Sequence, residues 1–286
     1  MQSSKSYKSE LVGVFGHPVA ENPTVVMMEA AFRAAGLDYR YLTIEVLPEA
    51  LEAAVGGVRA MGFQGINLTI PHKIAVMKHL DELSEDAALI GAVNTVYRRG
   101  RKLIGENTDG KGFIASLAEA GLDIAGRSFV LLGAGGAARA ISVELALARA
   151  ARITIVNRDE GRGRALAKHV AGIGGAKVEY SPWTAGYKLP GGTDVLANAT
   201  SIGLYPDPGR PDIDYAAIGH GIIVCDVIPN PPQSAFLREA KARGARTLDG
   251  LGMLVNQGAI GFKLWTDAEA PIAAMRDALA REFGAA

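Results

Sequence analysis

The chain has 286 residues, of which 49% are hydrophobic, and its thirty basic and thirty acidic residues give a formal net charge of zero. This length exceeds one average domain and falls short of three, so we expect two domains with buried cores. Balanced charge without a basic run argues against nucleic acid or an anionic membrane as a partner. We therefore expect a small-molecule substrate as the partner, and a monomer or a homodimer.

Three sequence features bear on the cellular compartment of the protein. Residues 1–5 are polar, and no apolar run approaches the length of a membrane span. Cys225 is the single cysteine and lies in an apolar run, so it has no partner for an intramolecular disulfide. These features predict a cytoplasmic protein with an inert cysteine in its core.

The first hundred residues alternate between strand and helix patterns. Strands are expected at residues 11–15, 39–46 and 65–68, and helices are expected to begin at Pro23, Pro48 and Pro71. Asn22 suits the N-cap of the first helix. This βαβαβα order predicts an α/β domain with a mainly parallel sheet, which a hairpin of residues 94–97 and 103–105 completes.

A glycine-rich turn lies at the centre of the chain. Apolar residues 129–132 precede a turn at Gly133, Ala134, Gly135, Gly136 and Ala137, and helical spacing continues to residue 150. Gly133, Gly135 and Ala138 fit the G-x-G-x-x-A pattern, in which small residues let a pyrophosphate approach a helix N-terminus. A second strand is expected at residues 152–156, at the distance from the first strand that a βαβ unit requires. The pattern predicts a Rossmann dinucleotide-binding domain, although such a turn also occurs in other parallel-sheet proteins.

The residues after that second strand indicate which dinucleotide binds. Asn157 and Arg158 stand where NAD sites usually have an acidic residue, and Arg162 follows. A guanidinium suits a 2′-phosphate, so we expect NADP as the cofactor. Asp159 keeps NAD open as the alternative, although it equally suits the N-cap of the next helix.

The remaining segments complete the expected domains. Strands near residue 178 and at residues 195–197 and 222–227 extend the second sheet, and residues 248–283 carry two helices that we expect to pack back on the first domain. The expected division is a substrate-binding domain of residues 1–108 and 247–286 and an NADP-binding domain of residues 109–246.

Two charged residues are candidates for proton transfer. Lys73 follows Pro71 in the first turn of a helix, where the dipole disfavours a cation and would lower its pKa. Such a lysine can exchange a proton with a substrate oxygen, as reduction of a ketone by a hydride requires. Asp109 becomes its partner if the two side chains face each other. The alternatives are a solvated lysine and an N-capping aspartate, and we interpret the adjacent His72 as structural or as a residue that supports Lys73.

Neutral polar residues at loop and strand ends are candidates for binding hydroxyl groups or a cofactor. Asn67, Asn94, Asn107 and Gln257 can bind hydroxyls, with capping as the alternative. Asn198, Ala199 and Thr200 follow an apolar strand and could line a nicotinamide.

Taken together, the motifs resemble those of the shikimate dehydrogenases and their quinate/shikimate relatives over almost the full length. The matching segments are Asn67-Leu68-Thr69-Ile70-Pro71-His72-Lys73, Gly91-Ala92-Val93-Asn94-Thr95, Asn107-Thr108-Asp109-Gly110, the turn from Gly133 to Ala137, Asn157-Arg158, Asn198-Ala199-Thr200 and Gly252-Met253-Leu254-Val255-Asn256-Gln257.

The resemblance implies a role for each matching position. Lys73 and Asp109 become the catalytic couple. The implied substrate-binding residues are Asn22, Thr24, Asn67, Thr69, Asn94 and Gln257. The implied NADP-binding residues are Gly133, Ala134, Gly135, Gly136, Ala137, Asn157, Arg158, Arg162 and Thr200, and no metal is implied. The implied reaction is the NADP-dependent interconversion of 3-dehydroshikimate and shikimate.

Two departures from the family pattern fall on one end of the substrate. The resemblance implies a Ser-x-Ser-Pro run whose hydroxyls bind the substrate carboxylate, but this chain has Asn22-Pro23-Thr24-Val25. A tyrosine expected after Asp-Val-x is replaced by Pro229. We therefore expect reduced activity on shikimate, or a preference for a related hydroxylated ring with a different substituent.

Two other classes of protein share part of this pattern. A relative of methylene-tetrahydrofolate dehydrogenase would share the glycine turn, but the Asn107-Thr108-Asp109-Gly110 run argues against it. A non-catalytic sensor of quinate or shikimate would share the binding residues, but the presence of both Lys73 and Asp109 argues against that class.

Overall fold

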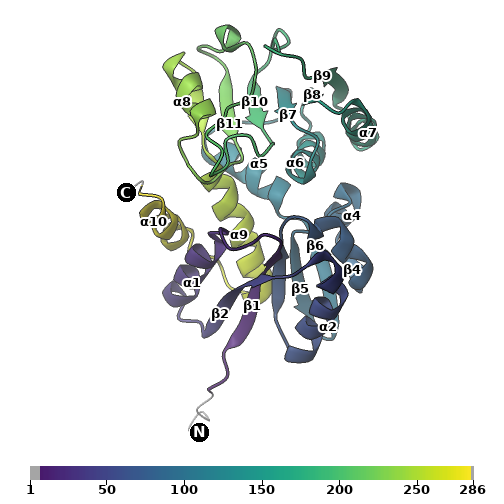
Figure 1. Cartoon of the computed structure of the whole chain (residues 1–286), viewed down its shortest axis with the longest axis vertical. Helices are drawn as coiled ribbons and strands as arrows, with labels where there is room; N and C mark the ends of the chain where they lie inside the picture. Colours follow the sequence, from purple (N-terminus) through teal and green to yellow (C-terminus); the bar gives the residue numbers. More distant parts are fainter. Residues whose placement is uncertain (1–6, 285–286) are drawn as a thin grey trace. The chain divides into compact units, whose positions relative to one another are not determined.

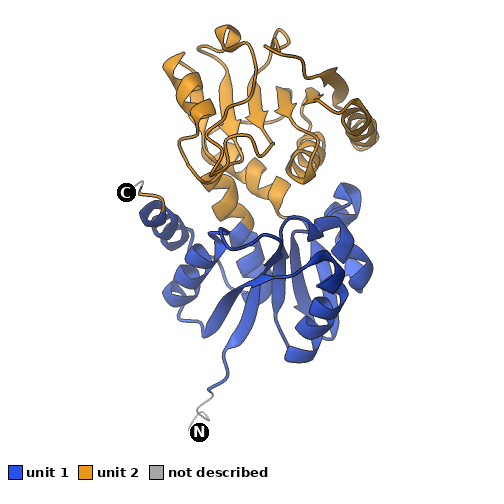
Figure 2. Cartoon of the chain, viewed as in Figure 1, with its two compact units in different colours: residues 1–107, 258–282 blue, residues 108–257, 283–286 orange. Residues whose placement is uncertain are grey.

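The computed structural model describes residues 7–284, so the polar segment 1–5 lies outside the described residues. It divides into unit 1, residues 1–107 and 258–282, and unit 2, residues 108–257 and 283–286 (Figure 2). The first division lies next to the crossing expected after residue 108, whereas the second falls inside a helix rather than ahead of residue 247. Among the described residues, no helix has the length and hydropathy needed to cross a membrane.

Unit 1 contains a six-stranded mixed sheet. Its strands are β1 Glu10–Gly16, β2 Tyr39–Glu45, β3 Gly65–Leu68, β4 Glu82–Leu83, β5 Thr95–Arg99 and β6 Lys102–Glu106, in the spatial order β2-β1-β3-β5-β6-β4 (Figure 1). β1 pairs in parallel with β2 and β3, and β5 pairs antiparallel with β3 and β6. The expected mainly parallel sheet and its closing hairpin are therefore confirmed.

Helices cover both faces of this sheet. They are α1 Thr24–Ala34, α2 Leu51–Met61, α3 His72–Ala75, α4 Glu85–Ile90, the second part of α9 Gly250–Thr266, and α10 Ile272–Glu282, with 3-10 turns at Pro48–Ala50 and Val76–His79. Because side chains alternate along a strand, Ile66 and Leu68 of β3 pack on the face of α2. Gly65 and Asn67 point to the opposite face, where Trp265 of α9 lies against Gly65.

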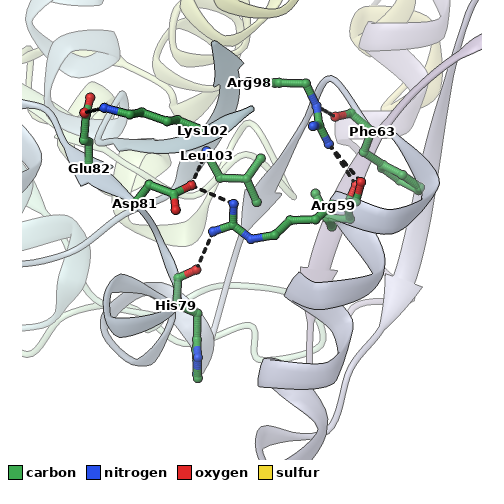
Figure 3. Close-up of polar contacts among 9 residues, drawn as sticks. Arg59, Phe63, His79, Asp81, Glu82, Arg98, Lys102 and Leu103 are labelled. Atoms are coloured by element: carbon green, nitrogen blue, oxygen red, sulfur yellow. Dashed lines mark hydrogen bonds and ion pairs between the residues drawn. The ribbon is translucent and has the colours of Figure 1, made fainter. Parts of the chain in front are cut away.

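Charged side chains fasten α2 and the segment after it to the hairpin (Figure 3). Arg98 of β5 donates to the backbone oxygens of Phe63 and Val58, at 2.7 and 3.1 Å. The Asp81 carboxylate accepts from Arg59 of α2 at 2.6 Å and from the backbone N–H of Leu103 at 2.7 Å. These bonds hold the hairpin of β5 and β6 to α2 and to the segment that precedes β4.

The expected helix starts in unit 1 are each one or more residues early. α1 begins at Thr24, so Pro23 is its N-cap residue and Asn22 is not. The Asn22 Oδ1 atom accepts from the Thr24 N–H at 3.0 Å, which forms an Asx turn just before the helix. Pro48 opens a 3-10 turn ahead of α2, and Pro71 precedes the single-turn helix α3.

Unit 2 contains an all-parallel sheet. Its strands are β7 Ser128–Leu132, β8 Arg152–Asn157, β9 Lys177–Pro182, β10 Val195–Asn198, β11 Ile223–Asp226 and β12 Arg246–Leu248, in the order β12-β11-β10-β7-β8-β9. Its helices are α5 Asp109–Glu119, α6 Gly136–Leu147, α7 Glu160–Ala171, α8 Ala235–Ala242 and the first part of α9, with a 3-10 turn at Tyr215–Ala217. This is the 3-2-1-4-5-6 order of a doubly wound dinucleotide-binding sheet, so the Rossmann prediction is confirmed.

Two glycines in α5 allow other backbone segments of unit 2 to approach it closely. A Cβ atom on Gly110 would lie 2.5 Å from the backbone oxygen of Ala140 in α6. A Cβ atom on Gly112 would lie 2.7 Å from the oxygen of Met253 and 2.8 Å from the nitrogen of Gln257 in α9. The glycines after Asp109 therefore fix the position of the helix that Asp109 begins.

A substitution at Gly65 tests how tightly α9 docks on the sheet of unit 1. A Cβ atom there would lie 2.1 Å from the Val96 oxygen and 2.2 Å from Trp265 Nε1, two atoms joined by a 2.9 Å hydrogen bond. Gly65→Ala should therefore lower the free energy of unfolding by about 2 kcal/mol, measured by urea denaturation.

Gly56→Ala is the matched control. Gly56 lies inside α2, is exposed, and would place its Cβ in open space. This substitution should raise the free energy of unfolding by about 0.5–1 kcal/mol. Equal effects of the two substitutions would contradict the close docking at Gly65.

Candidate functional site

The glycine turn of unit 2 joins β7 to α6. Gly133 has a φ of +112° and donates its N–H to the Val156 oxygen of β8 at 2.7 Å. A Cβ atom there would lie 2.9 Å from Thr200 Cγ2, so both the backbone conformation and the space require glycine. Thr200 follows β10, and the strand order reverses between β7 and β10, where ligands of such sheets bind.

The residues of this turn fit a bound diphosphate. Cβ atoms on Gly135 or Gly136 would meet nothing within 4 Å, and no side chain caps the N-terminus of α6. The N–H groups of Gly136 and Ala137, in the first helical turn, therefore lie at an uncapped positive dipole end beside open space. The expected strand, turn and helix are confirmed.

Two arginines follow β8 and fit a 2′-phosphate. Arg158 and Arg162 are exposed, and within residues 7–284 their side chains make no hydrogen bond or ion pair. Arg164, by contrast, is paired with Glu160 at 2.6 Å and lies over the Tyr180 ring. Two unpaired guanidinium groups close together in sequence provide charge for an anion.

Asp159 has the capping role that the sequence allowed. Its Oδ1 atom accepts from the Arg162 N–H at 2.9 Å and caps α7, and the Asn157 amide donates to the Asp159 backbone oxygen at 2.9 Å. The carboxylate is thus committed to the helix terminus, which favours NADP over NAD.

A buried carboxylate organises the loops after β10 and β11. Asp226 accepts from Asn198 Nδ2 at 3.1 Å and from the Ser234 hydroxyl at 2.6 Å. The Asn198 Oδ1 atom accepts from the Thr200 hydroxyl at 2.6 Å, so the chain of bonds extends to the residue beside Gly133. Asp226 is 2% exposed, and burial raises the pKa of its carboxyl to about 6 although these hydrogen bonds oppose the rise.

In unit 1, a row of hydrogen bonds joins two residues of the expected substrate set. The Tyr41 hydroxyl donates to Asn67 Oδ1 at 2.7 Å. Asn67 Nδ2 donates to the Asn94 oxygen at 3.2 Å and to Thr95 Oγ1 at 3.0 Å. Tyr41 is missing from the sequence prediction, because nothing in a strand pattern shows which residue a tyrosine hydroxyl will reach.

The other polar candidates of unit 1 are held by the backbone. The Asn107 amide donates to the Ala92 oxygen at 3.0 Å, and the Asn94 N–H donates to the Glu106 oxygen at 3.1 Å. The Thr69 N–H donates to the Phe15 oxygen at 2.9 Å. None of these asparagines caps a helix, so capping does not explain their presence.

Lys73 belongs to unit 1 and Asp109 belongs to unit 2. Lys73 is the second residue of α3, is half-buried, and accepts from the Val93 N–H through its backbone oxygen at 2.8 Å. Since α3 is a single turn, the dipole argument for Lys73 is weaker than the sequence suggested. Asp109 is the first residue of α5 and 8% exposed, and Thr108 is the N-cap residue, so the capping alternative for Asp109 is wrong.

Two neighbouring residues support these positions. His72 is buried, and its Nε2 atom lies 2.7 Å from the Val46 oxygen, which confirms its structural role. Within unit 2, the Thr108 hydroxyl donates to Gln257 Oε1 at 3.3 Å, so the expected substrate glutamine lies beside the residue that precedes Asp109.

The doubly wound sheet, the open glycine turn and the two unpaired arginines define a dinucleotide-binding protein. Comparison with known proteins narrows this class. Residues 14–96 match the shikimate dehydrogenase substrate binding domain, and residues 250–280 match the shikimate 5'-dehydrogenase C-terminal domain.

Similar proteins extend over nearly the whole chain. The shikimate dehydrogenase (NADP(+)) of Methanopyrus kandleri is 43% identical over 284 residues, which cover 95% of each chain. The ligand-free 5-ketofructose reductase of a Gluconobacter species is 50% identical, with a TM-score of 0.92 over 97% of this chain and 100% of that one. The Thermus thermophilus shikimate 5-dehydrogenase in complex with NADP(H) and shikimate is 35% identical, with a TM-score of 0.85 over 95% and 99%.

The chain therefore belongs to the shikimate dehydrogenase family. It is an NADP-dependent oxidoreductase that acts on a CH–OH group, as the sequence predicted.

The raised pKa of Asp226 predicts how stability changes with pH. Because its pKa is about 6 in the folded chain and 3.8 ordinarily, the protonated form stabilises the fold at low pH, and this contribution is lost as the pH rises through 6. Relative to Asp226→Asn, the wild type should therefore gain about 1 kcal/mol of unfolding free energy between pH 8 and pH 5. Urea titrations at both pH values measure this difference, and a constant difference would contradict the shift.

Proposed function

We propose that the chain interconverts a hydroxylated ring ketone and its alcohol with NADP, the substrate pair being 3-dehydroshikimate and shikimate or a close hydroxylated ring analogue. The observation that carries this proposal is the open, uncapped glycine turn beside the unpaired Arg158 and Arg162. We assign residues 1–108 and 247–286 to substrate binding and residues 109–246 to NADP binding. A cytoplasmic location accords with the buried, unbridged Cys225.

The proposed chemistry needs one acid and one group that orients it. Bound NADPH supplies the hydride to the carbonyl carbon. Lys73, as an ammonium, donates a proton to the carbonyl oxygen as it becomes an alkoxide. Asp109, as a carboxylate, orients the ammonium group and relays a proton from water back to the neutral lysine, a role that its buried position at the start of α5 supports.

The proposed substrate contacts suit hydroxyl groups. Asn67, Asn94 and Gln257 are neutral and buried, and the Asn67 and Gln257 side chains are fixed by hydrogen bonds within their own units. Fixed neutral groups bind hydroxyls in defined directions without placing a charge near the reacting carbonyl. We therefore assign the ring hydroxyls to these three side chains, with Thr69 beside them in sequence.

Removing the proposed acid should slow the chemistry without weakening cofactor binding. Lys73→Ala should lower kcat by about a hundredfold or more, while the Kd for NADPH measured by fluorescence titration stays unchanged. Lys78→Ala is the control, because Lys78 is an exposed lysine in the next turn of the chain. A Lys73→Ala enzyme with wild-type kcat would exclude Lys73 as the acid.

The preference for NADP should depend on the unpaired arginines. Arg158→Ala should raise the KM for NADP by about tenfold or more and leave the KM for NAD nearly unchanged, because only NADP carries the phosphate. Arg164→Ala is the matched control, since the Arg164 guanidinium is engaged by Glu160. Equal losses with both cofactors would assign Arg158 to a structural role.

A further inference from the structure

We propose that Asp226 is a positioning residue for NADP. It acts through Asn198 to hold Thr200 against the glycine turn, and it is absent from the site residues that the sequence predicts. Asp226 is 2% exposed, so it contributes by holding other residues rather than by touching the cofactor. This proposal rests on the proposed cofactor site, because it concerns the loop that borders that site.

Three neighbouring strands of the unit 2 sheet end in register. Asn198, the last residue of β10, is the register partner of Leu132 in β7 and of Asp226 in β11. Side chains of register partners in a parallel sheet point to the same face, so Asp226 lies beside Asn198. Gly133 follows Leu132, so the glycine turn begins one strand away from Asn198 and two strands away from Asp226.

The Asn198 side chain is fully engaged in hydrogen bonds. Its two N–H groups donate to Asp226 Oδ1 and to the Ile202 backbone oxygen, both at 3.1 Å. Its Oδ1 atom accepts from the Thr200 hydroxyl at 2.6 Å and from the Thr200 N–H at 3.2 Å. The reversed amide would set Oδ1 against the Ile202 oxygen, which is also an acceptor, so the network fixes the orientation. Asn198 therefore links Asp226 to Thr200.

Thr200 contributes to the cofactor site through its position. Its hydroxyl donates its one hydrogen to Asn198 and accepts from the Ile202 N–H at 3.1 Å. Its γ-methyl group faces the glycine turn, with Cγ2 2.9 Å from the place that a Cβ atom on Gly133 would occupy. A shift of Thr200 would therefore change the space in which the turn meets a diphosphate.

The Asp226 carboxylate has no opposite charge to compensate its burial. Within residues 7–284 no lysine, arginine or histidine pairs with it, and burial raises its pKa to about 6. Besides Asn198, it accepts from the Ser234 hydroxyl at 2.6 Å and from the Ile228 N–H at 3.2 Å. Ser234 and Ile228 follow β11 in the chain, so the Asn198 bond is the link of Asp226 to the glycine turn.

The test separates the bond to Asn198 from the negative charge. Asp226→Val has no acceptor, so it leaves the Asn198 N–H unpaired and releases Thr200. Its Kd for NADPH, measured by fluorescence titration, should be about tenfold higher than that of the wild type. Asp226→Asn also removes the charge, but its amide oxygen still accepts from Asn198, so its Kd should stay within about twofold of the wild type. An equal rise in both variants would assign the effect to the charge and overturn the proposal.

Ser234→Ala is the matched control for a loss of stability. The Ser234 hydroxyl donates to Asp226 Oδ2 and accepts from the Leu237 N–H at 3.3 Å. The substitution therefore removes one bond of Asp226 and the cap of α8, while the bond to Asn198 remains. It should lower the Tm and leave the Kd for NADPH unchanged. A Kd that rises with every fall in Tm would show that Asp226 serves stability alone.

A double substitution tests whether Asp226 acts through Asn198. Asn198→Ala should raise the Kd for NADPH by about tenfold, and adding Asp226→Val should raise it no further. Independent contributions would instead multiply to about a hundredfold, which would exclude the route through Asn198. If Asp226→Val does not fold, Thr200→Val serves in its place, because it keeps the γ-methyl group and loses the hydroxyl. Its Kd should also rise about tenfold, and an unchanged Kd would overturn the proposal.

Failure of the proposed function gives a different result. A wild type that binds no NADPH would contradict the proposed cofactor site, and this proposal would fall with it. A wild type that binds NADPH, with the same Kd in Asp226→Val and in Asn198→Ala, would overturn this proposal alone and leave the proposed function standing.

Discussion

The close approach of Gly133 to Thr200 is the constraint on which the cofactor half of this enzyme depends. A Cβ atom on Gly133 would meet Thr200 Cγ2 at 2.9 Å and the Ala199 oxygen at 3.0 Å, so the loops after β7 and β10 lie in contact. The chain can then turn at once into α6, whose uncapped first turn adjoins open space. A larger residue at Gly133 would separate the two loops and displace the helix N-terminus that a diphosphate needs.

In unit 1, the hydrogen-bonding capacity of Asn67 is determined by the buried groups that surround its side chain. Asn67 would look like an ordinary donor if judged by residue type alone. The Tyr41 hydroxyl donates to Asn67 Oδ1, and the Asn67 Nδ2 group donates to the Asn94 oxygen and to Thr95 Oγ1. These three bonds fix the orientation of the Asn67 amide, which its residue type does not show by itself.

The sequence predicts what depends on local pattern and misses what depends on distant partners. The strands, the glycine turn and the Asp159 cap are readable because neighbouring residues decide them. The short elements β4, α4, α8 and β12 were not predicted, because runs of two to eight residues carry little periodicity. The bond from Tyr41 to Asn67 spans 26 residues and depends on strand register, which no local pattern encodes.

Asp226 is a buried carboxylate that lowers the stability of the fold but fixes the geometry of two loops. Its carboxylate accepts from Asn198, Ser234 and the Ile228 N–H, so it joins the ends of β10 and β11 to the cap of α8. Removing a carboxylate from water costs free energy that these bonds only partly offset, as its raised pKa shows. Because Asn198 also holds Thr200, the same carboxylate fixes the loop that touches Gly133. The loss in stability thus accompanies a fixed geometry at the edge of the sheet where the cofactor binds.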